Sequence, residues 1–370
     1  MIKFRTSLFA SAAVSATLLL GPTAVSAADK PVADPAPTEF LSKLDPQMKE
    51  VVEAMLATKQ PPLHELEPAK ARKGLTFADA VKAVEKKRGE STKKQEVGDR
   101  DKIKVAGKNS KLDALLFRPV GNKGKDTSQA PLPVLVYFHG GGFVIADAEV
   151  YEASARALAN SANCVVISVD YSLAPEHQFP AAAEDAYAAT QYIIENSAQM
   201  NIDSKRVAVG GESAGGNLAT EVCLLSKERG GAMPVAQLLV YPVTDWMSTR
   251  PSHVEYGSSP VLPEKNLPWF AGYYLPSKED GMKVEASPIY AKSFKGLPPA
   301  TIILAQLDVL ADDGKAYGEK LKADGVEVTV KEYKGVTHEF FGMGAVVDKA
   351  KEAEDFAAAQ LKKAFAAGAQ

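Results

Sequence analysis

Two glycine-rich turns follow apolar runs that predict buried strands. The first, Gly211-Glu212-Ser213-Ala214-Gly215, comes directly after Val207–Gly210 and opens a helical stretch. Small residues on both sides let a serine sit at a sharp strand-to-helix bend, with its hydroxyl raised above the sheet. The bend also points the Ala214 N–H at the place where negative charge would form. Ser213 is therefore a candidate nucleophile; the alternative is a glycine-rich turn with a bystander serine.

The second turn, His139-Gly140-Gly141-Gly142, follows Leu132–Phe138 just as directly. Three consecutive glycines leave backbone N–H groups unshielded, so an anion can approach them closely. The N–H groups of Gly140 and Gly141 would face a nearby alkoxide from one side, and the N–H of Ala214 would face it from the other. Donors fixed before the reaction contribute roughly 3 kcal/mol each to transition-state stabilisation. The alternative is a flexible loop, and His139 is expected to organise the loop rather than to transfer protons.

Two more polar residues fall at strand ends. Asp308 follows the apolar run 301–305, and His338 follows the run that ends at Tyr333. The chain order Ser213, Asp308, His338 is the order of an α/β-hydrolase triad. His338 would take the serine proton and return it to the leaving group, while Asp308 would hold the imidazole tautomer. Asp308 could instead be a helix cap, with the acids at 312 and 313 as competitors; the remaining histidines, at 64, 177 and 253, are poor rivals of His338.

Short apolar runs alternate with helical stretches from about residue 102 onward. Runs that are apolar throughout, rather than at every second residue, indicate burial on both faces and hence a parallel sheet between helices. The carboxyl ends of such strands are where open α/β sheets place their sites. The predicted strands are 132–138, 165–169, 207–210, 238–241, 301–305 and 326–333, with antiparallel edge strands at 103–105 and 114–117. The predicted helices are 151–160, 181–196, 214–229, 312–324 and 348–365.

The N-terminus is typical of an export signal. Lys3 and Arg5 precede a modestly apolar core, and Val25-Ser26-Ala27 offers small residues before a cleavage point. The core is shorter than the roughly 20 residues that a bilayer span needs, which disfavours a membrane anchor. We therefore expect a protein that is periplasmic or secreted, with no stable membrane insertion.

Composition excludes several classes of protein. The chain has 370 residues and a formal net charge of −3, so it has no excess of positive charge with which to bind nucleic acid. Two cysteines exclude a disulfide scaffold and a thiolate zinc site. An oxidising compartment would permit a bond between Cys164 and Cys223, but buried free thiols are the favoured interpretation.

Beyond these single features, several motifs together resemble the hormone-sensitive-lipase-like family of esterases and lipases. The similarity runs from about residue 110 to 365 and rests on His139-Gly140-Gly141-Gly142-Phe143, Val169-Asp170-Tyr171-Ser172-Leu173-Ala174-Pro175-Glu176-His177, Phe179-Pro180-Ala181-Ala182, Gly211-Glu212-Ser213-Ala214-Gly215-Gly216-Asn217-Leu218 and Leu297-Pro298-Pro299-Ala300.

The resemblance implies an α/β-hydrolase fold, a mostly parallel central sheet flanked by helices, with a helical cap. It implies carboxylic-ester hydrolysis through an acyl-serine, with no metal or organic cofactor. Carried over by motif, Ser213 is the nucleophile, Asp308 the acid and His338 the base, and the oxyanion donors are the N–H groups at 140, 141 and 214. Four residues depart from the family pattern: Ser172, Glu212, Glu339 and Ala146.

The expected organisation is a signal peptide over 1–27, a linker and N-terminal helical cap segment over 28–100, and a catalytic domain over 101–370 with a cap insertion at about 246–285. Residues 246–274 hold six aromatic side chains, which either fill the core or form a lid, and we favour the lid. The expected pocket residues are Phe143, Trp246, Trp269, Phe270 and Phe341.

The leading hypothesis is a serine carboxylesterase, monomeric or homodimeric, that acts on short to medium acyl esters, including aromatic ones. Its partner would be a small-molecule ester and not a nucleic acid. One alternative is an arylamide or carbamate deacetylase or a lipase, because the same triad performs all of these reactions. Another is a non-catalytic ligand-binding protein on the same scaffold, which the complete triad disfavours.

Overall fold

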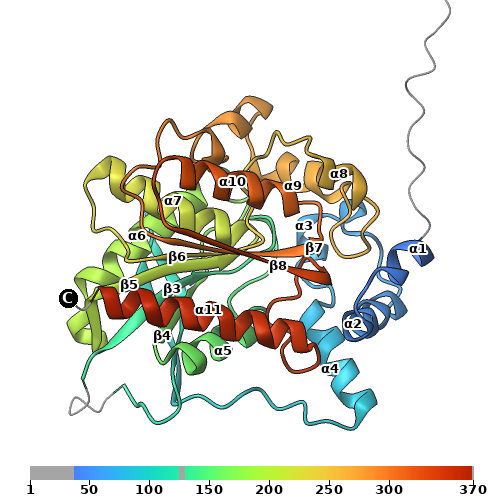
Figure 1. Ribbon diagram of the computed structural model, residues 1–370, viewed down its shortest axis with the longest axis horizontal. Helices are drawn as coiled ribbons and strands as arrows, with labels where there is room; N and C mark the ends of the chain where they lie inside the picture. The colour runs from blue at the N-terminus through green and yellow to red at the C-terminus, as the bar shows by residue number, and fades with distance from the viewer. Residues whose placement is uncertain (1–36, 125–129, 369–370) are drawn as a thin grey trace, which may run out of the picture. The chain divides into compact units, whose positions relative to one another are not determined.

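The computed structural model describes residues 37–124 and 130–368. The predicted signal over 1–27, and the start of the linker after it, lie outside the described residues. Within the described part an eight-stranded sheet runs in the order β1-β2-β4-β3-β5-β6-β7-β8 (Figure 1). Its strands are β1 (Asp99–Ala106), β2 (Lys111–Arg118), β3 (Leu132–Phe138), β4 (Val165–Val169), β5 (Ile202–Glu212), β6 (Gln237–Val240), β7 (Ala300–Leu307) and β8 (Val328–Thr337).

Strands β3 to β8 pair in parallel, whereas β1 pairs with β2 and β2 with β4 in antiparallel register. All five residues of β4 are buried, as expected for a parallel strand covered on both faces. The predicted α/β-hydrolase sheet with an antiparallel edge is confirmed. The parallel pairing brings the carboxyl ends of β5, β6, β7 and β8 to the same edge.

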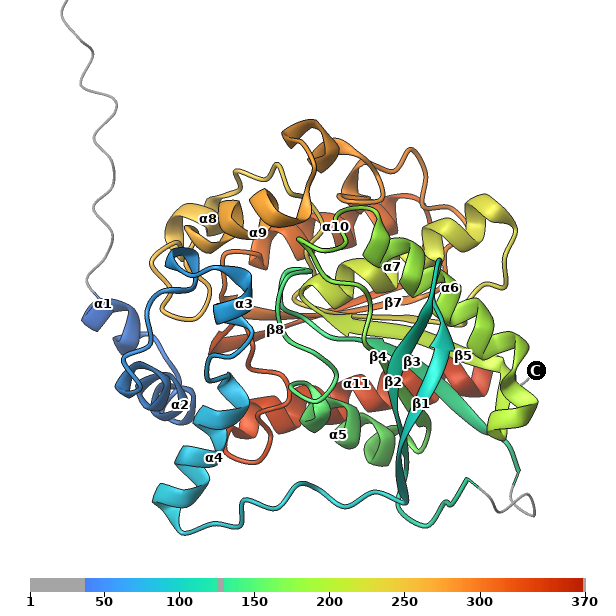
Figure 2. The same cartoon turned by 180° about the vertical axis from the view of Figure 1, so that it is seen from behind.

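Helices cover both faces of the sheet. Contacts place α5 and α11 on one face and α6, α7 and α10 on the other, and Figures 1 and 2 show the two layers from opposite sides. The helices flanking the sheet are α5 (Glu152–Ala162), α6 (Ala181–Glu195), α7 (Ala214–Arg229), α10 (Ala311–Ala323) and α11 (Asp348–Ala367). The other helices are α1 (Pro37–Ser42), α2 (Pro46–Ala57), α3 (Pro68–Ala71), α4 (Phe77–Arg88), α8 (Pro251–Glu255) and α9 (Asn266–Tyr274).

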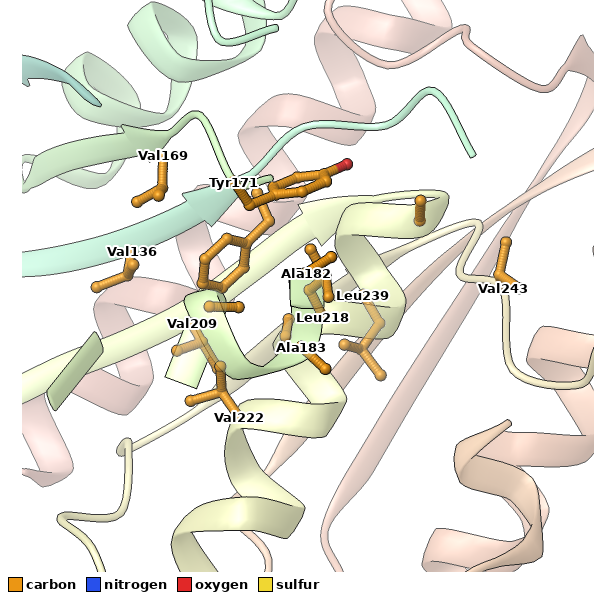
Figure 3. Packing of buried hydrophobic residues seen from close by; sticks show 14 of the residues in the cluster. Val136, Val169, Tyr171, Ala182, Ala183, Val209, Leu218, Val222, Leu239 and Val243 are labelled. Carbon is orange, nitrogen blue, oxygen red and sulfur yellow. The ribbon is translucent and has the colours of Figure 1, made fainter. Parts of the chain in front are cut away.

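Alternate residues of β3 enter two buried clusters. Val136 packs in the cluster beneath α6, α7 and α10, while Tyr137 packs in the cluster on the opposite face. Figure 3 shows Val136 and Val209 of neighbouring strands beside Leu218 and Val222 of α7. These apolar contacts hold α7 against the sheet, and so they fix the position of the residue just before it.

Within the expected N-terminal helical segment, the apolar residues that recur at helical spacing from 40 to 56 form two helices rather than one. α1 ends at Ser42, and α2 begins at Pro46 after Asp45, whose side chain accepts a hydrogen bond from the Gln47 N–H (3.0 Å). Proline is well suited to the first turn of a helix but interrupts a helix interior, so the apolar spacing continues across a break in the backbone.

The helix α4 has a defined residue at each of its ends. Thr76 and Asp79 form a capping box at the start of α4, and Gly89 ends the helix with φ +72°. A glycine adopts this left-handed conformation without the steric penalty that a side chain would bring.

Both cysteines, Cys164 and Cys223, are buried free thiols, which agrees with the favoured interpretation. Among the described helices none is long and apolar enough to cross a membrane.

Candidate active site

Ser213 stands alone between β5 and α7 in a strained conformation. Its φ is +55° and its ψ is −115°, a region that non-glycine residues adopt at a cost of roughly 1–3 kcal/mol. The Ser213 N–H donates to the Val240 carbonyl (2.9 Å), and the Ser213 carbonyl accepts from the Val243 N–H (3.1 Å). The bend is therefore tied to the end of the neighbouring strand, β6.

Glycine is required on both sides of Ser213 because the backbones of β3, β5 and α7 approach one another closely there. A Cβ on Gly215 would lie 1.9 Å from the Phe138 carbonyl oxygen, and one on Gly211 would lie 2.4 Å from the Gly215 backbone. No side chain fits at either position unless α7 moves away from β3. The predicted steric basis of the Gly-x-Ser-x-Gly turn is thus visible in the contacts.

The glycine loop after β3 lies beside this bend. The N–H groups of Gly140, Gly141 and Ala214 donate to no acceptor among the residues that the structure describes. Gly141 and Gly142 have φ values of +100° and +58°, and a Cβ on Gly140 would lie 2.4 Å from the Tyr151 hydroxyl. Unpaired N–H groups held by a rigid loop are what an oxyanion site requires.

His139 organises this loop, as the sequence predicts. Its imidazole is buried, hydrogen-bonds through Nδ1 to the Gly140 carbonyl (2.7 Å) and stacks on the Tyr171 ring at 4.3 Å. Burial lowers the pKa of His139 to about 4, so the ring is neutral near pH 7. The Tyr171 hydroxyl in turn donates to the His139 carbonyl (2.9 Å).

Asp308 and His338 meet directly. His338 Nδ1 lies 2.7 Å from Asp308 Oδ2, and both side chains are almost fully buried, at 3% and 0% exposure. The second Asp308 oxygen, Oδ1, accepts from the Leu310 N–H (3.0 Å). A carboxylate in this position fixes the imidazole with its proton on Nδ1 and Nε2 free to accept another.

Opposing effects act on the pKa of His338. Burial acts to lower it, but the charge and hydrogen bond of Asp308 raise it, as does the nearby carboxyl of Glu339. The pKa of His338 ends above its ordinary value. The Tyr241 ring packs against the imidazole, with 4.5 Å between the ring centroids.

The strand order explains why these residues share one edge. Ser213 follows β5, Tyr241 follows β6, Asp308 follows β7 and His338 follows β8, and these four strands are consecutive neighbours in the sheet. No hydrogen bond among the described residues joins the Ser213 hydroxyl to His338. Such bonds are often long without substrate and tighten when it binds.

The competing acids are engaged elsewhere. Asp313 hydrogen-bonds to Arg250 (2.8 Å) and His253 (2.9 Å), and Asp312 accepts from the Ser252 N–H (3.0 Å). His253 is therefore the partner of Asp313 rather than of Asp308. His64 hydrogen-bonds to Asn266 at 3.2 Å, and neither histidine hydrogen-bonds to Asp308.

A buried network under the bend was not anticipated from the sequence. Glu212 is fully buried and accepts hydrogen bonds from the hydroxyls of Tyr137 (2.7 Å) and Tyr241. Burial raises the pKa of Glu212 to about 8, so the carboxyl keeps its proton near pH 7. In the sequence Glu212 is only a departure from the family pattern, and no local spacing points to Tyr137 or Tyr241 as its partners.

The expected pocket aromatics separate into groups. Phe143 stacks on Tyr274 at 4.0 Å and lies 6.0 Å from the Trp246 ring. Phe270 closes on the glycine loop, since a Cβ on Gly142 would lie 2.2 Å from its ring. Phe341 is buried in the cluster on the opposite face of the sheet, so the structure does not group it with the others.

Trp269 turns toward the N-terminal segment. Its ring packs edge-on against Phe270 at 5.1 Å, and its Nε1–H donates to the Leu66 carbonyl (2.9 Å). The Tyr273 hydroxyl donates to Glu67 (3.1 Å) in the same way. The two segments predicted to form a cap, one N-terminal and one within 246–285, therefore contact each other.

A cavity of about 380 Å³ lies at the opposite edge of the sheet. It is lined by residues at the starts of β6, β7 and β8 and at the end of α11, among them Gln237, Ala300 and Gln360. None of the candidate catalytic residues lines it. The described residues also contain no group of three or more His, Cys, Asp or Glu side chains placed to hold a metal ion.

Comparison with known proteins agrees with this geometry. Residues 135–342 match the family described as having the alpha/beta hydrolase fold. The chain belongs to this family. The matched region begins within β3 and ends after His338, so it contains both glycine turns and the Asp308–His338 pair.

Relatives of this α/β-hydrolase are named as ester hydrolases. It is 42% identical to esterase LipI of Mycobacterium tuberculosis over 226 residues, which is 61% of this chain and 71% of that protein. It is 34% identical to an ethyl acetate hydrolase of Pseudomonas putida over 292 residues, which is 79% of this chain and 88% of that protein.

Solved structures show the same fold. A hyperthermophilic esterase from Pyrobaculum calidifontis is 32% identical and superposes with a TM-score of 0.78, over 86% of this chain and 98% of that one. A thermostable esterase from Pseudomonas putida ECU1011 is 31% identical with a TM-score of 0.78, over 87% and 98%.

Proposed function

We propose that this α/β-hydrolase is a serine carboxylesterase for short to medium acyl esters, acting through an acyl-serine. One observation carries the proposal: the Asp308–His338 pair lies at the same sheet edge as a serine held in a strained bend beside three unpaired backbone N–H groups. Each part serves one requirement of acyl transfer, namely a base, a nucleophile and an anion site.

The proposed reaction has two halves. His338 Nε2 takes the proton of the Ser213 hydroxyl while the serine oxygen bonds to the carbonyl carbon of the ester, and the carbonyl oxygen becomes an anion facing the loop N–H groups. The tetrahedral species then collapses to an acyl-serine as His338 protonates the departing alcohol. Water attacks the acyl group by the same route in reverse, and the acid leaves.

Support for a small ester comes from the aromatic groups near the glycine loop. The rings of Phe143, Trp246 and Tyr274 pack on one another, and Phe270 lies against Gly142. We propose that the α9 segment and the N-terminal helices cap the site, since the Trp269 and Tyr273 hydrogen bonds join them. A capped aromatic pocket suits short or aromatic esters better than long acyl chains.

A series of p-nitrophenyl esters of increasing acyl length tests this proposal. We expect kcat/KM to be highest at short to medium lengths and to fall as the chain outgrows a capped pocket. The control is the Ser213→Ala variant, which corrects for spontaneous hydrolysis of these activated esters. A rate maximum at long acyl chains would contradict the proposed substrate class, and no hydrolysis of any ester would contradict the proposed activity.

We propose further that the protein is exported, on the strength of the residues at 1–27. The charged start, the apolar core and the small residues before Ala27 support that proposal.

A further inference from the structure

A second carboxylate lies on the other side of the His338 ring from Asp308. Glu339 Oε1 is 4.0 Å from His338 Nε2, the nitrogen that the proposed reaction uses, whereas Asp308 binds Nδ1. The imidazole is therefore flanked by two acids. At 4.0 Å the Glu339 carboxyl does not hydrogen-bond to Nε2, so its influence acts through space.

Glu339 is held in place at a conformational cost. Its φ is +65°, in the left-handed region that side chains disfavour, and 24% of its side chain remains exposed. Both of its carboxyl oxygens lie within hydrogen-bonding distance of the Tyr151 hydroxyl, at 2.8 and 2.9 Å. A strained backbone that persists must be held by its surroundings, and strain of this kind clusters at functional sites.

Tyr151 connects this carboxylate to the proposed oxyanion loop. Its hydroxyl occupies the space that a Cβ on Gly140 would need, with 2.4 Å between them. The same hydroxyl that anchors Glu339 therefore lies directly behind Gly140. The Tyr151 hydroxyl therefore contacts both the loop that carries His338 and the loop that carries the N–H donors.

The groups that face His338 come from several elements. Asp308 comes from the end of β7 and Glu212 from the end of β5, while the Tyr241 ring after β6 covers one side of the imidazole. Glu339 itself faces His338, Asp308 and the Tyr151 hydroxyl. Glu212 is fully buried between two tyrosine hydroxyls, whereas 24% of the Glu339 side chain is exposed. Burial raises the pKa of Glu339, and the charge of His338 and the Tyr151 hydroxyl act against that rise.

We propose that Glu339 is a positioning residue for the base: its carboxylate stabilises the His338 cation from the Nε2 side and, through Tyr151, holds the base loop against the oxyanion loop. The inference rests on the proposed esterase function. In the step concerned, the O–H bond of Ser213 breaks, the proton moves to His338 Nε2 and the serine oxygen bonds to the ester carbon. Glu339 exchanges no proton in this step.

The sign of the effect follows from the charges. A carboxylate beside Nε2 favours the protonated imidazole, so His338 becomes a free base only at higher pH than it would without Glu339. Removing the charge should move the acid limb of the kcat/KM profile to lower pH. The same change should lower the plateau rate, because the cation formed in the transition state loses part of its stabilisation.

The decisive comparison is the pH profile of kcat/KM on a short p-nitrophenyl ester for wild type and for Glu339→Gln. Glutamine keeps the shape and an oxygen for Tyr151 but removes the charge. We expect the acid limb to move down by about one pH unit, and the plateau to fall about tenfold. Glu339→Asp keeps the charge and should keep its acid limb closer to that of wild type than to that of Glu339→Gln.

Glu327→Gln is the matched control. Glu327 is an exposed acid paired with Lys363 at 2.7 Å, and it lies just before β8, at the opposite end of that strand from His338. It should show the wild-type profile. An acid limb that stays at its wild-type pH in Glu339→Gln, whether or not the plateau falls, would overturn the inference while leaving the esterase proposal intact. A wild type that hydrolyses no ester would overturn the proposed function, and the inference with it.

Discussion

Replacing Ser213 by alanine is expected to lower kcat for ester hydrolysis by about a millionfold, the scale found when a triad nucleophile is removed. The serine oxygen is the only atom that the proposal allows to form the acyl intermediate, and alanine leaves no replacement in the bend. Substrate binding should survive, because the pocket and the N–H donors are untouched. Steady-state kinetics on the best ester of the series, together with equilibrium binding of a non-hydrolysable analogue, measure the two effects separately.

Ser226→Ala is the control for this prediction. Ser226 is a buried serine on the same helix, α7, where its hydroxyl accepts a hydrogen bond from Gln191 (3.3 Å). It should retain wild-type activity. Ester hydrolysis by Ser213→Ala at a rate within tenfold of wild type would mean that another group attacks the ester.

Replacing Asp308 by asparagine is expected to reduce kcat by about ten-thousandfold with little change in KM. Asp308 accepts from His338 Nδ1 at 2.7 Å and from the Leu310 N–H at 3.0 Å. An asparagine that turns its NH2 toward His338 holds the wrong tautomer, with the proton on Nε2. Nε2 then cannot accept the serine proton, and the cation has lost its counter-charge.

Asp312→Asn separates this role from a general loss of acidic charge. Asp312 lies on α10 close to Asp308 in sequence, but its carboxyl accepts from the Ser252 N–H and pairs with Lys315 (3.5 Å). It should keep near wild-type kcat. A folded Asp308→Asn variant with more than a tenth of the wild-type kcat would show that the aspartate does not orient the base.

Burial on both faces is what made the central strands predictable. The predicted bounds of β3, β4 and α7 agree with the structure: β3 is followed by His139 and the glycine loop, β4 by Asp170 and α7 by Gly230. β5 begins at Ile202, five residues before the predicted start. The added residues include Asp203 and Lys205, whose polar side chains interrupt the apolar pattern although the backbone is already in the strand.

The end of β8, a strand at the edge of the sheet, is also difficult to predict from the sequence. Its burial alternates irregularly and it continues to Thr337, four residues beyond its predicted end, through the exposed Lys334. Most residues of this edge strand are partly or fully exposed, so hydrophobicity alone does not mark its end. The four extra residues matter because they extend β8 to the sheet edge at which Asp308 lies, and His338 follows directly.

Sequence could predict the Asp308–His338 pair because strand order and motif order both point to it. It could not predict the partners of Glu212 or Glu339. Tyr137 lies 75 residues from Glu212, and Tyr151 lies 188 residues from Glu339. No local spacing encodes contacts of this range; they depend on which side chains the folded sheet brings together.

The most direct test of the proposed triad is covalent labelling of the folded protein with a fluorophosphonate, followed by mass spectrometry of its peptides. We expect a single adduct, on Ser213, that forms rapidly in wild type, is absent in Ser213→Ala and is greatly slowed in His338→Ala, since the hydroxyl reacts only when Nε2 removes its proton. Folded wild-type protein that hydrolyses esters but carries its label on another residue, or that labels Ser213 equally fast without the imidazole, would contradict the proposed mechanism.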